Sequence, residues 1–302
     1  AISLNLTVGI LGELSLGHAG FMSVGAFAGV VASTGLSSTI TSAPLRLAVA
    51  MVIGALFAAI AGFLIGIPVL RLRGDYLAIV TLAFGEIIKE IISCLIVGTD
   101  EKGLHIVFNY NGAKTVDDLG LTPTGTAIIK GAQGATGTQT IASFTAGFVL
   151  IMVALVIVLN FVNSRSGRAV MAIRDNRIAA ESVGINITKY KMIAFTISAA
   201  IAGAAGALYG LNYSNITSAK FDFNTSILIL VFVVLGGLGN IRGSIISATV
   251  LYVLPEALRE FADYRMLVYA IVLILVMIAT NSSKVRTLLT RLLPHKREKE
   301  VD

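Results

Sequence analysis

Long apolar stretches separated by shorter polar segments make up most of the chain. One of them, 140–162, carries no charge and exceeds the roughly 20 residues of helix that cross a bilayer. Strict alternation of apolar and polar residues is absent, so the pattern predicts helices rather than the strands of a membrane barrel. The apolar stretches are 1–12, 19–35, 45–70, 76–97, 140–162, 192–211, 226–238, 243–258 and 266–279. We therefore predict an all-α polytopic integral membrane protein of about eight to nine helical segments, some short or broken.

Glycine marks places where these helices are irregular or close together. The stretch 226–238 contains Gly236 and Gly237 near its end, which is typical of a short or broken helix. GxxxG spacings also occur, and they let membrane helices approach closely. They lie at Gly25 and Gly29, at Gly62 and Gly66, and at Gly206 and Gly210. Because the chain has 30 glycines, chance spacing stays as open an interpretation as helix contact.

The composition supports the same class of protein. Hydrophobic residues make up 56% and charged residues 13% of the chain, and the mean hydropathy of +0.87 lies well outside the range of soluble globular proteins. The single cysteine, Cys94, lies in an apolar stretch, so it forms no internal disulfide and we expect it to pack in the core. The first residue is not methionine, and we expect further residues upstream. We identify no catalytic or metal-binding motif.

The polar segment 164–191 is strongly basic. It contains Arg165, Arg168, Arg174, Arg177, Lys189 and Lys191 but only two acids, Asp175 and Glu181. The net charge of +6 is compatible with a nucleic-acid partner, but basic residues in short loops between membrane helices set the topology instead. We therefore expect no nucleic-acid binding and place 164–191 in the cytoplasm.

Threading the chain back and forth from 164–191 places the other basic clusters on the same side. They are Arg71, Arg73, Arg242 and the tail 282–302. The opposite side then carries 98–139, the longest polar segment, and a loop of this length is usually functional or disordered. We predict one transmembrane domain, 1–281, followed by a basic cytoplasmic tail, 282–302.

The segment 164–191 carries the signals of a short helix. Asp175 or Asn176 can cap its start. Residues 177–183 form two turns, about 10 Å of helix, and Gly184 suits the left-handed position past the end. Small apolar residues and charges on this helix could contact and orient a partner. A basic loop that only sets topology remains the alternative.

The same segment resembles a known functional element. Residues 167–185 read GRAVMAIRDNRIAAESVGI and are similar to the cytoplasmic coupling loop of ABC importer permeases, which docks into a cleft of the ATPase subunit. That loop carries an Ala-Ala pair and a glycine a few residues later. Here these residues are Ala179, Ala180 and Gly184.

Two further stretches narrow the resemblance. They are GELSLGHAGFMSVGAFAG at 12–29 and RLRGDYLAIVTLAFGEIIKEI at 71–91. Both are similar to the permeases of branched-chain amino-acid ABC importers, in particular the M-type subunit, and the resemblance covers most of 1–280. It departs from the family after the helix that contains Glu86, where this chain has a longer insertion in place of a Thr-Gly-Gly-rich segment.

The resemblance implies an ABC-importer permease bundle over 1–281, acting as the non-catalytic pore subunit of an ATP-driven importer of branched-chain amino acids. It implies a homologous second permease subunit, two ABC ATPase subunits, an extracytoplasmic substrate-binding protein and the lipid bilayer of a bacterial or archaeal plasma membrane as partners. The chain has no GxxxxGK[ST] motif, so partner subunits use the ATP and this chain binds no cofactor. The residues implied for ATPase coupling are Arg168, Arg174, Asp175, Arg177, Ala179, Ala180, Glu181 and Gly184.

The glycine-rich stretch 12–20 is the candidate for the substrate path. Its glycines surround Glu13, Ser15 and His18, and glycine at this density suggests a helix broken within the membrane. A break frees backbone amides, and a helix amino end attracts a carboxylate such as that of an amino acid. The possible path residues are Ser15, Gly17, His18 and Thr81. Close helix packing, with His18 hydrogen-bonded to a neighbour, is the alternative.

Charged residues along the stretch 76–97 predict local contacts. Asp75 precedes the stretch and is well placed to cap its helix. Glu86, Lys89 and Glu90 can pair at short helical spacing.

Two other transporter classes remain as alternatives. A sugar or nucleoside ABC permease shares the fold family and part of the coupling loop. An ion-coupled secondary transporter also contains broken helices. Ion coupling favours acids buried well inside the spans, however, and most charges here lie near the ends of the spans.

Overall fold

The computed structural model describes residues 1–257, apart from 73, 101–102, 110–111, 113 and 123–124, together with 271 and 274. This part of the chain folds into ten α-helices and a five-stranded sheet. The predictions for Arg73, for the tail 282–302 and for most of 266–279 fall outside the described residues.

The elements follow one another along the chain with the strands grouped between α4 and α5. The helices are α1 (Ile2–Asn5), α2 (His18–Gly35), α3 (Ala43–Val69), α4 (Asp75–Ser93), α5 (Phe144–Asn163), α6 (Arg165–Asp175), α7 (Arg177–Ser182), α8 (Ile187–Gly210), α9 (Phe223–Leu235) and α10 (Ile241–Ala257), with a π-helical turn η1 at Leu6–Ile10. The strands are β1 (Leu95–Asp100), β2 (Gly103–Phe108), β3 (Thr126–Lys130), β4 (Ala135–Thr136) and β5 (Asn215–Ile216).

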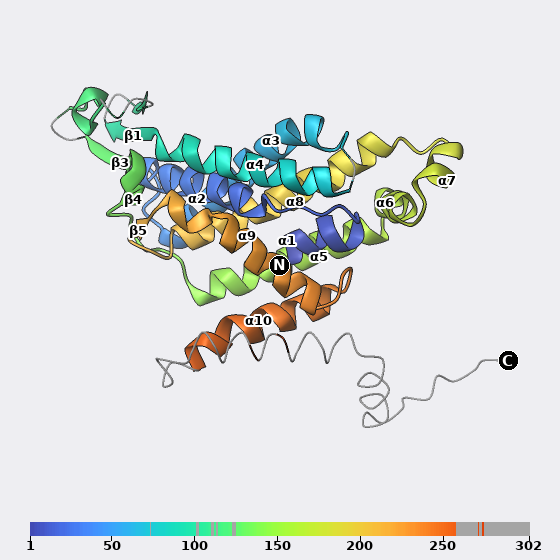
Figure 1. Cartoon of the computed structure of the whole chain (residues 1–302). Helices are drawn as coiled ribbons and strands as arrows, with labels where there is room; N and C mark the ends of the chain where they lie inside the picture. Colours follow the sequence, from blue (N-terminus) through green and yellow to red (C-terminus); the bar gives the residue numbers. More distant parts are fainter. Residues whose placement is uncertain are drawn as a thin grey trace.

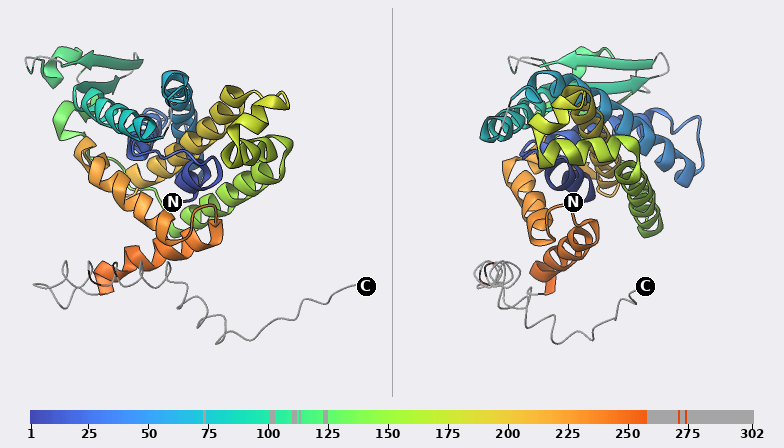
Figure 2. Two further views of the ribbon diagram at one scale, coloured as in Figure 1. Left: turned by 45° about the vertical axis from the view of Figure 1, so that its right-hand side comes forward. Right: turned by 90° about the vertical axis from the view of Figure 1, so that its right-hand side faces the viewer.

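Three of the helices, α3, α5 and α8, are long and apolar enough to cross a membrane. The prediction of a polytopic membrane bundle is confirmed in this respect. The helix α9 has only 13 residues, as predicted for a short or broken helix over 226–238. Figure 2 shows α5 at the edge of the bundle, and its Phe148, Val149 and Val156 side chains are exposed. A wide apolar face of this kind suits contact with lipid.

Glycine lets α2, α3 and α8 pack closely at the centre of the bundle. A Cβ added to Gly25 of α2 would lie 2.1 Å from the carbonyl oxygen of Gly203 on α8. A Cβ added to Gly206 of α8 would lie 1.9 Å from the carbonyl oxygen of Met22 on α2. The glycines of the third GxxxG spacing, Gly62 and Gly66 on α3, also lie against α8. The three GxxxG spacings are therefore helix contacts within this chain, which confirms that interpretation over chance.

Gly25→Ala is expected to destabilise the bundle by about 1–3 kcal/mol or more, the usual cost of overpacking a tight site. The added methyl group meets the backbone of Gly203, which cannot rotate away as a side chain can. Gly35→Ala, in the same helix, is the matched control, because a Cβ there meets no atom within 4 Å. Thermal unfolding of the detergent-purified protein measures both. Equal midpoints for the two variants would contradict this account of the α2–α8 contact.

The first helical region is broken, as predicted. The turn η1 ends at Ile10, Gly12 has a φ of +78°, and no regular helix follows until α2 begins at His18. Figure 1 shows α1 and η1 toward the end of the molecule that carries α6 and α7, whereas α2 runs toward the sheet. The break therefore reverses the direction of the chain inside the bundle.

A small sheet covers one end of the bundle, and the hydrophobic pattern did not predict it. The strand order is β2-β1-β3-β4-β5, with every pair antiparallel. The helix predicted over 76–97 ends at Ser93, Cys94 is partly buried at its end, and β1 begins at Leu95. The segment 98–139, predicted as a polar loop, contributes to β1 and forms β2, β3 and β4. The all-α prediction holds for the bundle and is wrong for this segment.

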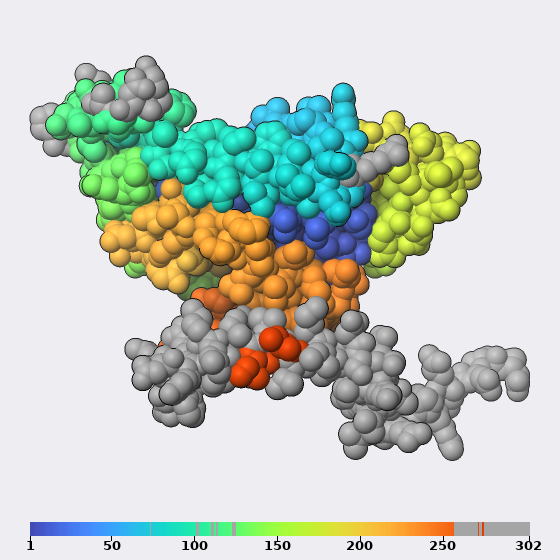
Figure 3. Space-filling view, viewed as in Figure 1, coloured from blue at the N-terminus to red at the C-terminus, as the bar shows by residue number. Residues whose placement is uncertain are grey.

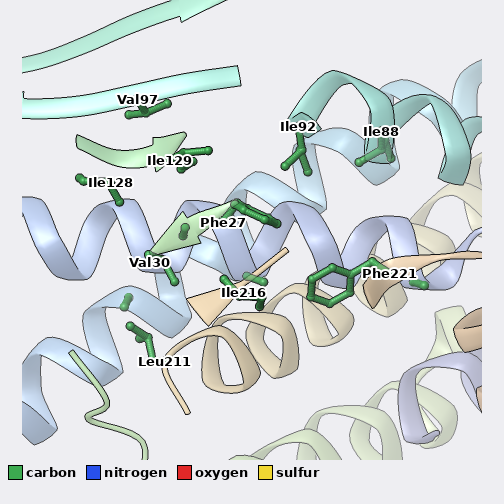
Figure 4. Close-up of a cluster of buried hydrophobic side chains, with 14 of the residues drawn as sticks. Phe27, Val30, Ile88, Ile92, Val97, Ile128, Ile129, Leu211, Ile216 and Phe221 are labelled. Carbon is green, nitrogen blue, oxygen red and sulfur yellow. The ribbon is translucent and has the colours of Figure 1, made fainter. Parts of the chain in front are cut away.

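The sheet forms because its apolar residues complete the core at that end. β-branched residues favour strands, and the apolar side chains of β1 and β3 pack against α2 and α4 (Figure 4). The cluster comprises Phe27, Val30, Ile88, Ile92, Val97, Ile128, Ile129, Leu211, Ile216 and Phe221. The strands are short and lie among polar residues. The alternation of apolar and polar side chains along them is therefore too brief to predict strands from the sequence.

Of the two predictions for charged residues of α4, the structure contradicts one and confirms the other. Asp75 is the first residue of the helix, Gly74 is the cap position, and no side chain caps it. The prediction that Asp75 caps α4 is therefore wrong, although an acid in the first turn still stabilises a helix. The predicted pair between Glu86 and Lys89 is confirmed, and Glu90 Oε1 lies 3.8 Å from the same ammonium nitrogen.

Candidate functional site

The coupling segment, residues 164–191, projects at the end of the molecule opposite the sheet (Figures 1 and 3). Within it, Asn176 caps α7, because its side-chain oxygen accepts a hydrogen bond from the Ala179 N–H at 3.0 Å. Past the end of α7, Gly184 has a φ of +82°, which is the left-handed region that glycine adopts readily. The predicted cap, helix and terminating glycine are confirmed.

A second helix in the coupling segment, α6, was not predicted. Its cap is Ser164, whose hydroxyl accepts a hydrogen bond from the Gly167 N–H at 3.1 Å. Val170 and Ile173 on α6 are buried, and residues three apart share one face of a helix. A capping serine followed by this spacing was the available signal for an amphipathic helix.

The tip of the coupling segment exposes apolar side chains. Ile178 is 81% exposed and Val183 is 74% exposed, and both flank the exposed Ala179 and Glu181. Large apolar side chains surrounded by charge are typical of a surface that contacts another protein. Exposed residues among those predicted for coupling are Arg168, Arg174, Asp175, Ala179, Glu181 and Gly184.

Two residues predicted for coupling contact the rest of the bundle. Ala180 is buried in a cluster with Ile173 and Ile187, so it holds α7 against α6 and α8. Arg174 donates a hydrogen bond from Nη1 to the Gly9 carbonyl oxygen at 2.9 Å. Both side chains help to fix the position of the coupling segment, and Arg174 remains partly exposed on its surface.

Lys191 was predicted to belong to a basic cytoplasmic face, and this prediction is wrong. Its side chain is only 5% exposed and forms an ion pair with Glu13. A charge is buried in this way only where an opposite charge compensates it. Glu13 had no predicted partner because 178 positions separate the two residues in the chain.

A small pocket of about 320 Å³ lies beside this ion pair. We call it the inner pocket. Five charged residues line it, from the break, α4, α6, α7 and α8: Glu13, Asp75, Arg174, Arg177 and Lys191. The inner pocket therefore lies between the coupling segment and the broken first helix.

A second pocket, of about 440 Å³, lies between α1, α2, α8, α9 and α10. We call it the central pocket. Its walls are largely apolar and include Met22, Ala202, Ala205, Ile229, Phe232 and Val253. Ser3, His18, Thr249 and Tyr252 supply polar groups. The volume falls within the roughly 300–1,000 Å³ of small-molecule sites, and apolar walls with a few polar groups are typical of them.

Of the predicted path residues, only His18 lines the central pocket. Its Nε2 lies 2.8 Å from the Ser3 hydroxyl. Its Nδ1 is buried and has no hydrogen-bond partner among the described residues. Ser15 is fully buried away from this pocket. His18 thus lines the central pocket and carries a buried nitrogen without a hydrogen-bond partner among the described residues.

Gly17 and Thr81 hold the break in place. A Cβ on Gly17 would lie 1.9 Å from the Thr81 carbonyl oxygen. The Thr81 hydroxyl accepts a hydrogen bond from the Leu16 N–H at 3.1 Å and donates one to the Ala78 carbonyl at 2.8 Å. Neither residue lines the central pocket, so both act by packing in this structure.

Backbone amides at the break are largely occupied. Besides the Leu16 N–H, the Ala19 N–H donates to the Ser226 hydroxyl at 3.2 Å and the Gly20 N–H donates to the Gly17 carbonyl at 3.0 Å. At these three positions the expectation of free amides for a carboxylate is wrong. Side chains from α4 and α9 accept two of these hydrogen bonds, and a backbone carbonyl oxygen accepts the third.

A comparison with known protein families identifies the chain. The family model "Branched-chain amino acid transport system / permease component" matches residues 1–278. The chain belongs to this family. The family assignment agrees with the apolar helices α3, α5 and α8, which are long and apolar enough to cross a membrane, and the family consists of permease components of transport systems.

Several curated proteins are similar to this permease. The high-affinity branched-chain amino acid transport system permease protein LivM of Escherichia coli (strain K12) is 34% identical over 283 residues, which cover 92% of this chain and 64% of LivM. The probable LivM of Methanocaldococcus jannaschii is 26% identical over 242 residues, covering 78% of this chain and 63% of the relative. The LivH permease protein of Salmonella typhimurium is 34% identical over 132 residues, covering 43% and 42%.

The permease spans 64% of the length of the E. coli relative, slightly less than two thirds. No solved structure matches it. Among the residues that the structure describes, no group of three or more His, Cys, Asp or Glu side chains could hold a metal ion. The candidate functional features described above are the inner pocket, the central pocket and the coupling segment.

Proposed function

We propose that this permease is the pore subunit of an ATP-driven importer of branched-chain amino acids, coupled to separate ATPase subunits through residues 164–191. The observation that carries the proposal is the projecting helix α7 with exposed Ile178 and Val183. These two apolar side chains lie among charged residues and are not covered by any other part of the described chain. Such a surface suits a cleft in another subunit. The similarity to LivM supports the choice of cargo.

The coupling proposal assigns different roles to the residues of the segment. Ile178 and Val183 enter the ATPase cleft, and the exposed Ala179 allows close approach beside them. The charges of Arg168, Asp175, Arg177 and Glu181 orient the ATPase, while Gly184 ends α7 so that its tip protrudes. ATP is hydrolysed by the partner, because this chain has no phosphate-binding loop.

The central pocket is the proposed passage for substrate. An aliphatic side chain fits its apolar walls, and Ser3 and His18 offer polar groups to the amino or carboxylate end. Ser15, Gly17 and Thr81 support the passage by holding the break next to His18. Weak, transient contacts of this kind suit transport, because a tightly bound substrate would leave slowly.

The remaining partners follow from the same proposal. A homologous second permease subunit pairs with this chain, and the similarity to both LivM and LivH supports two such subunits of one family. An extracytoplasmic binding protein delivers substrate to the sheet end. The coupling end and the tail 282–302 lie in the cytoplasm of a bacterial or archaeal cell, as positive charge near membrane helices favours.

Uptake by the reconstituted complex tests this function. The permease, its partner permease and the ATPases are placed in liposomes with ATP inside and the binding protein with labelled leucine outside. We expect uptake that requires ATP and is inhibited by unlabelled isoleucine or valine but not by ribose or adenosine. Inhibition by the sugar or nucleoside alone would favour the sugar permease class. Uptake driven by an ion gradient without ATP would contradict the proposal.

A further inference from the structure

Two attachments join the coupling segment to the broken first helix. In the last turn of α6, Arg174 donates from Nη1 to the Gly9 carbonyl oxygen at 2.9 Å. Its side chain also packs on Gly12, where an added Cβ would lie 2.6 Å from Arg174 Cγ. Near the start of α8, Lys191 pairs with Glu13. The helix α7 lies between α6 and α8 in the chain. Residues 9–13 are therefore bonded to the helix before α7, through Arg174, and to the helix after it, through Lys191.

The ion pair is strong enough to act as a link. The side chains of Lys191 and Glu13 are only 5% and 13% exposed. A surface ion pair contributes little to stability, but separating a buried pair leaves an uncompensated charge in a medium of low dielectric constant. Residues 9–13 are therefore held to α8 by a contact that resists separation when α8 moves.

A short irregular stretch leads from the ion pair to the central pocket. Five residues beyond Glu13 the chain reaches His18, which lines that pocket, and no regular helix lies between them. Five extended residues reach at most about 17 Å. Gly17 is packed tightly on Thr81, so a displacement of Glu13 acts on a short stretch that is fixed to α4 next to His18.

A second connection leads from the same region to the part of the central pocket that α10 lines. Asn5 in α1 donates a hydrogen bond to the Ser244 hydroxyl of α10 at 2.9 Å and accepts one from the Gly239 N–H at 2.9 Å. The helix α10 contributes Thr249 and Tyr252 to the central pocket. Movement of α1 and η1 therefore reaches the pocket through α10 as well as through the break.

We propose that Glu13 and Lys191 are positioning residues that, with Arg174, transmit movement of the coupling segment to the walls of the central pocket. This inference rests on the proposed function. The inner pocket supplies room for the movement and two further charges, Asp75 and Arg177. Each member of the ion pair thus has a second residue of opposite charge facing the same cavity, with which it can pair when α7 is displaced.

The ratio of leucine transported to ATP hydrolysed by the reconstituted complex tests the link. We expect Glu13→Gln to keep ATP hydrolysis near the wild-type rate and to lower the ratio about fivefold or more, the range of coupling between distant sites. The charge exchange of Glu13→Lys with Lys191→Glu restores most of the ratio. Lys189→Gln is the control for the loss of one charge near the ion pair, because Lys189 is exposed on α8 and takes no part in the pair of Glu13 with Lys191.

A purely structural role predicts different results. The double variant Glu13→Leu with Lys191→Leu removes both charges together, and such apolar replacements are often tolerated by the fold. A wild-type transport ratio in this variant would overturn the proposal. So would a charge exchange that keeps the wild-type thermal midpoint but does not recover the ratio. Failure of the wild-type complex to import leucine with ATP would instead refute the proposed function.

Discussion

Ile178→Glu is expected to abolish binding of the ATPase subunits and ATP-driven uptake while the permease still inserts and folds. Ile178 is 81% exposed, so a carboxylate there is fully hydrated in the isolated subunit. In the complex the same carboxylate enters an apolar cleft without a partner, which costs several kcal/mol. Loss of a central apolar anchor alone costs about 2 kcal/mol or more, on the order of 30-fold in affinity. Co-purification of the ATPases and leucine uptake measure the effect.

Thr188→Glu is the matched control for this variant. It introduces the same charge at an exposed position of the coupling segment, in the first turn of α8, where an acid is favourable. We expect it to retain co-purification and uptake. If Ile178→Glu also retained both, the tip of α7 would not be the contact with the ATPase, and the coupling assignment would have to be abandoned.

Ala248→Phe is expected to reduce uptake to near background while leaving ATPase binding unchanged. Ala248 lies on α10 and lines the central pocket of about 440 Å³. A phenyl ring at this position occupies the volume that an aliphatic side chain of the substrate would need, because apolar pockets discriminate chiefly by space. Leucine uptake by the reconstituted complex and co-purification of the ATPases measure the two effects separately.

The control for the pocket is Val250→Phe on the same helix. Val250 is 56% exposed and does not line the pocket, so its larger side chain projects toward lipid. We expect wild-type uptake from this variant. Normal uptake by Ala248→Phe would place the passage elsewhere in the permease and would leave His18 without a role in it.

The coupling segment shows why part of the site could be predicted. The Asn176 cap, the turns of α7 and the left-handed Gly184 depend on residues within ten positions of one another, and local hydrogen bonds and backbone conformation decide such features. The helix α6 could have been predicted for the same reason. Its signals in the sequence are the serine at 164 and the apolar residues Val170 and Ile173, three positions apart.

Other features depended on contacts between distant parts of the chain. The ion pair of Glu13 and Lys191 joins the break to α8, and neither residue carries a local sign of its partner. Arg174, predicted for ATPase coupling, also donates a hydrogen bond to the Gly9 carbonyl oxygen, a contact that the local sequence does not indicate. A basic residue near the end of a membrane span has the same local sequence whether it faces water or a buried carboxylate.

The sequence by itself determined the membrane bundle, the broken first helix, the coupling helix and the family, because each rests on hydrophobic length, glycine density or a contiguous motif. Only the tertiary structure decided that 98–139 folds into a sheet, that Lys191 is buried against Glu13 and that His18 alone among the path candidates lines the central pocket. The physical reason is common to all three. Burial of a short strand, an ion or an imidazole is favourable only when distant elements supply its core or its partner.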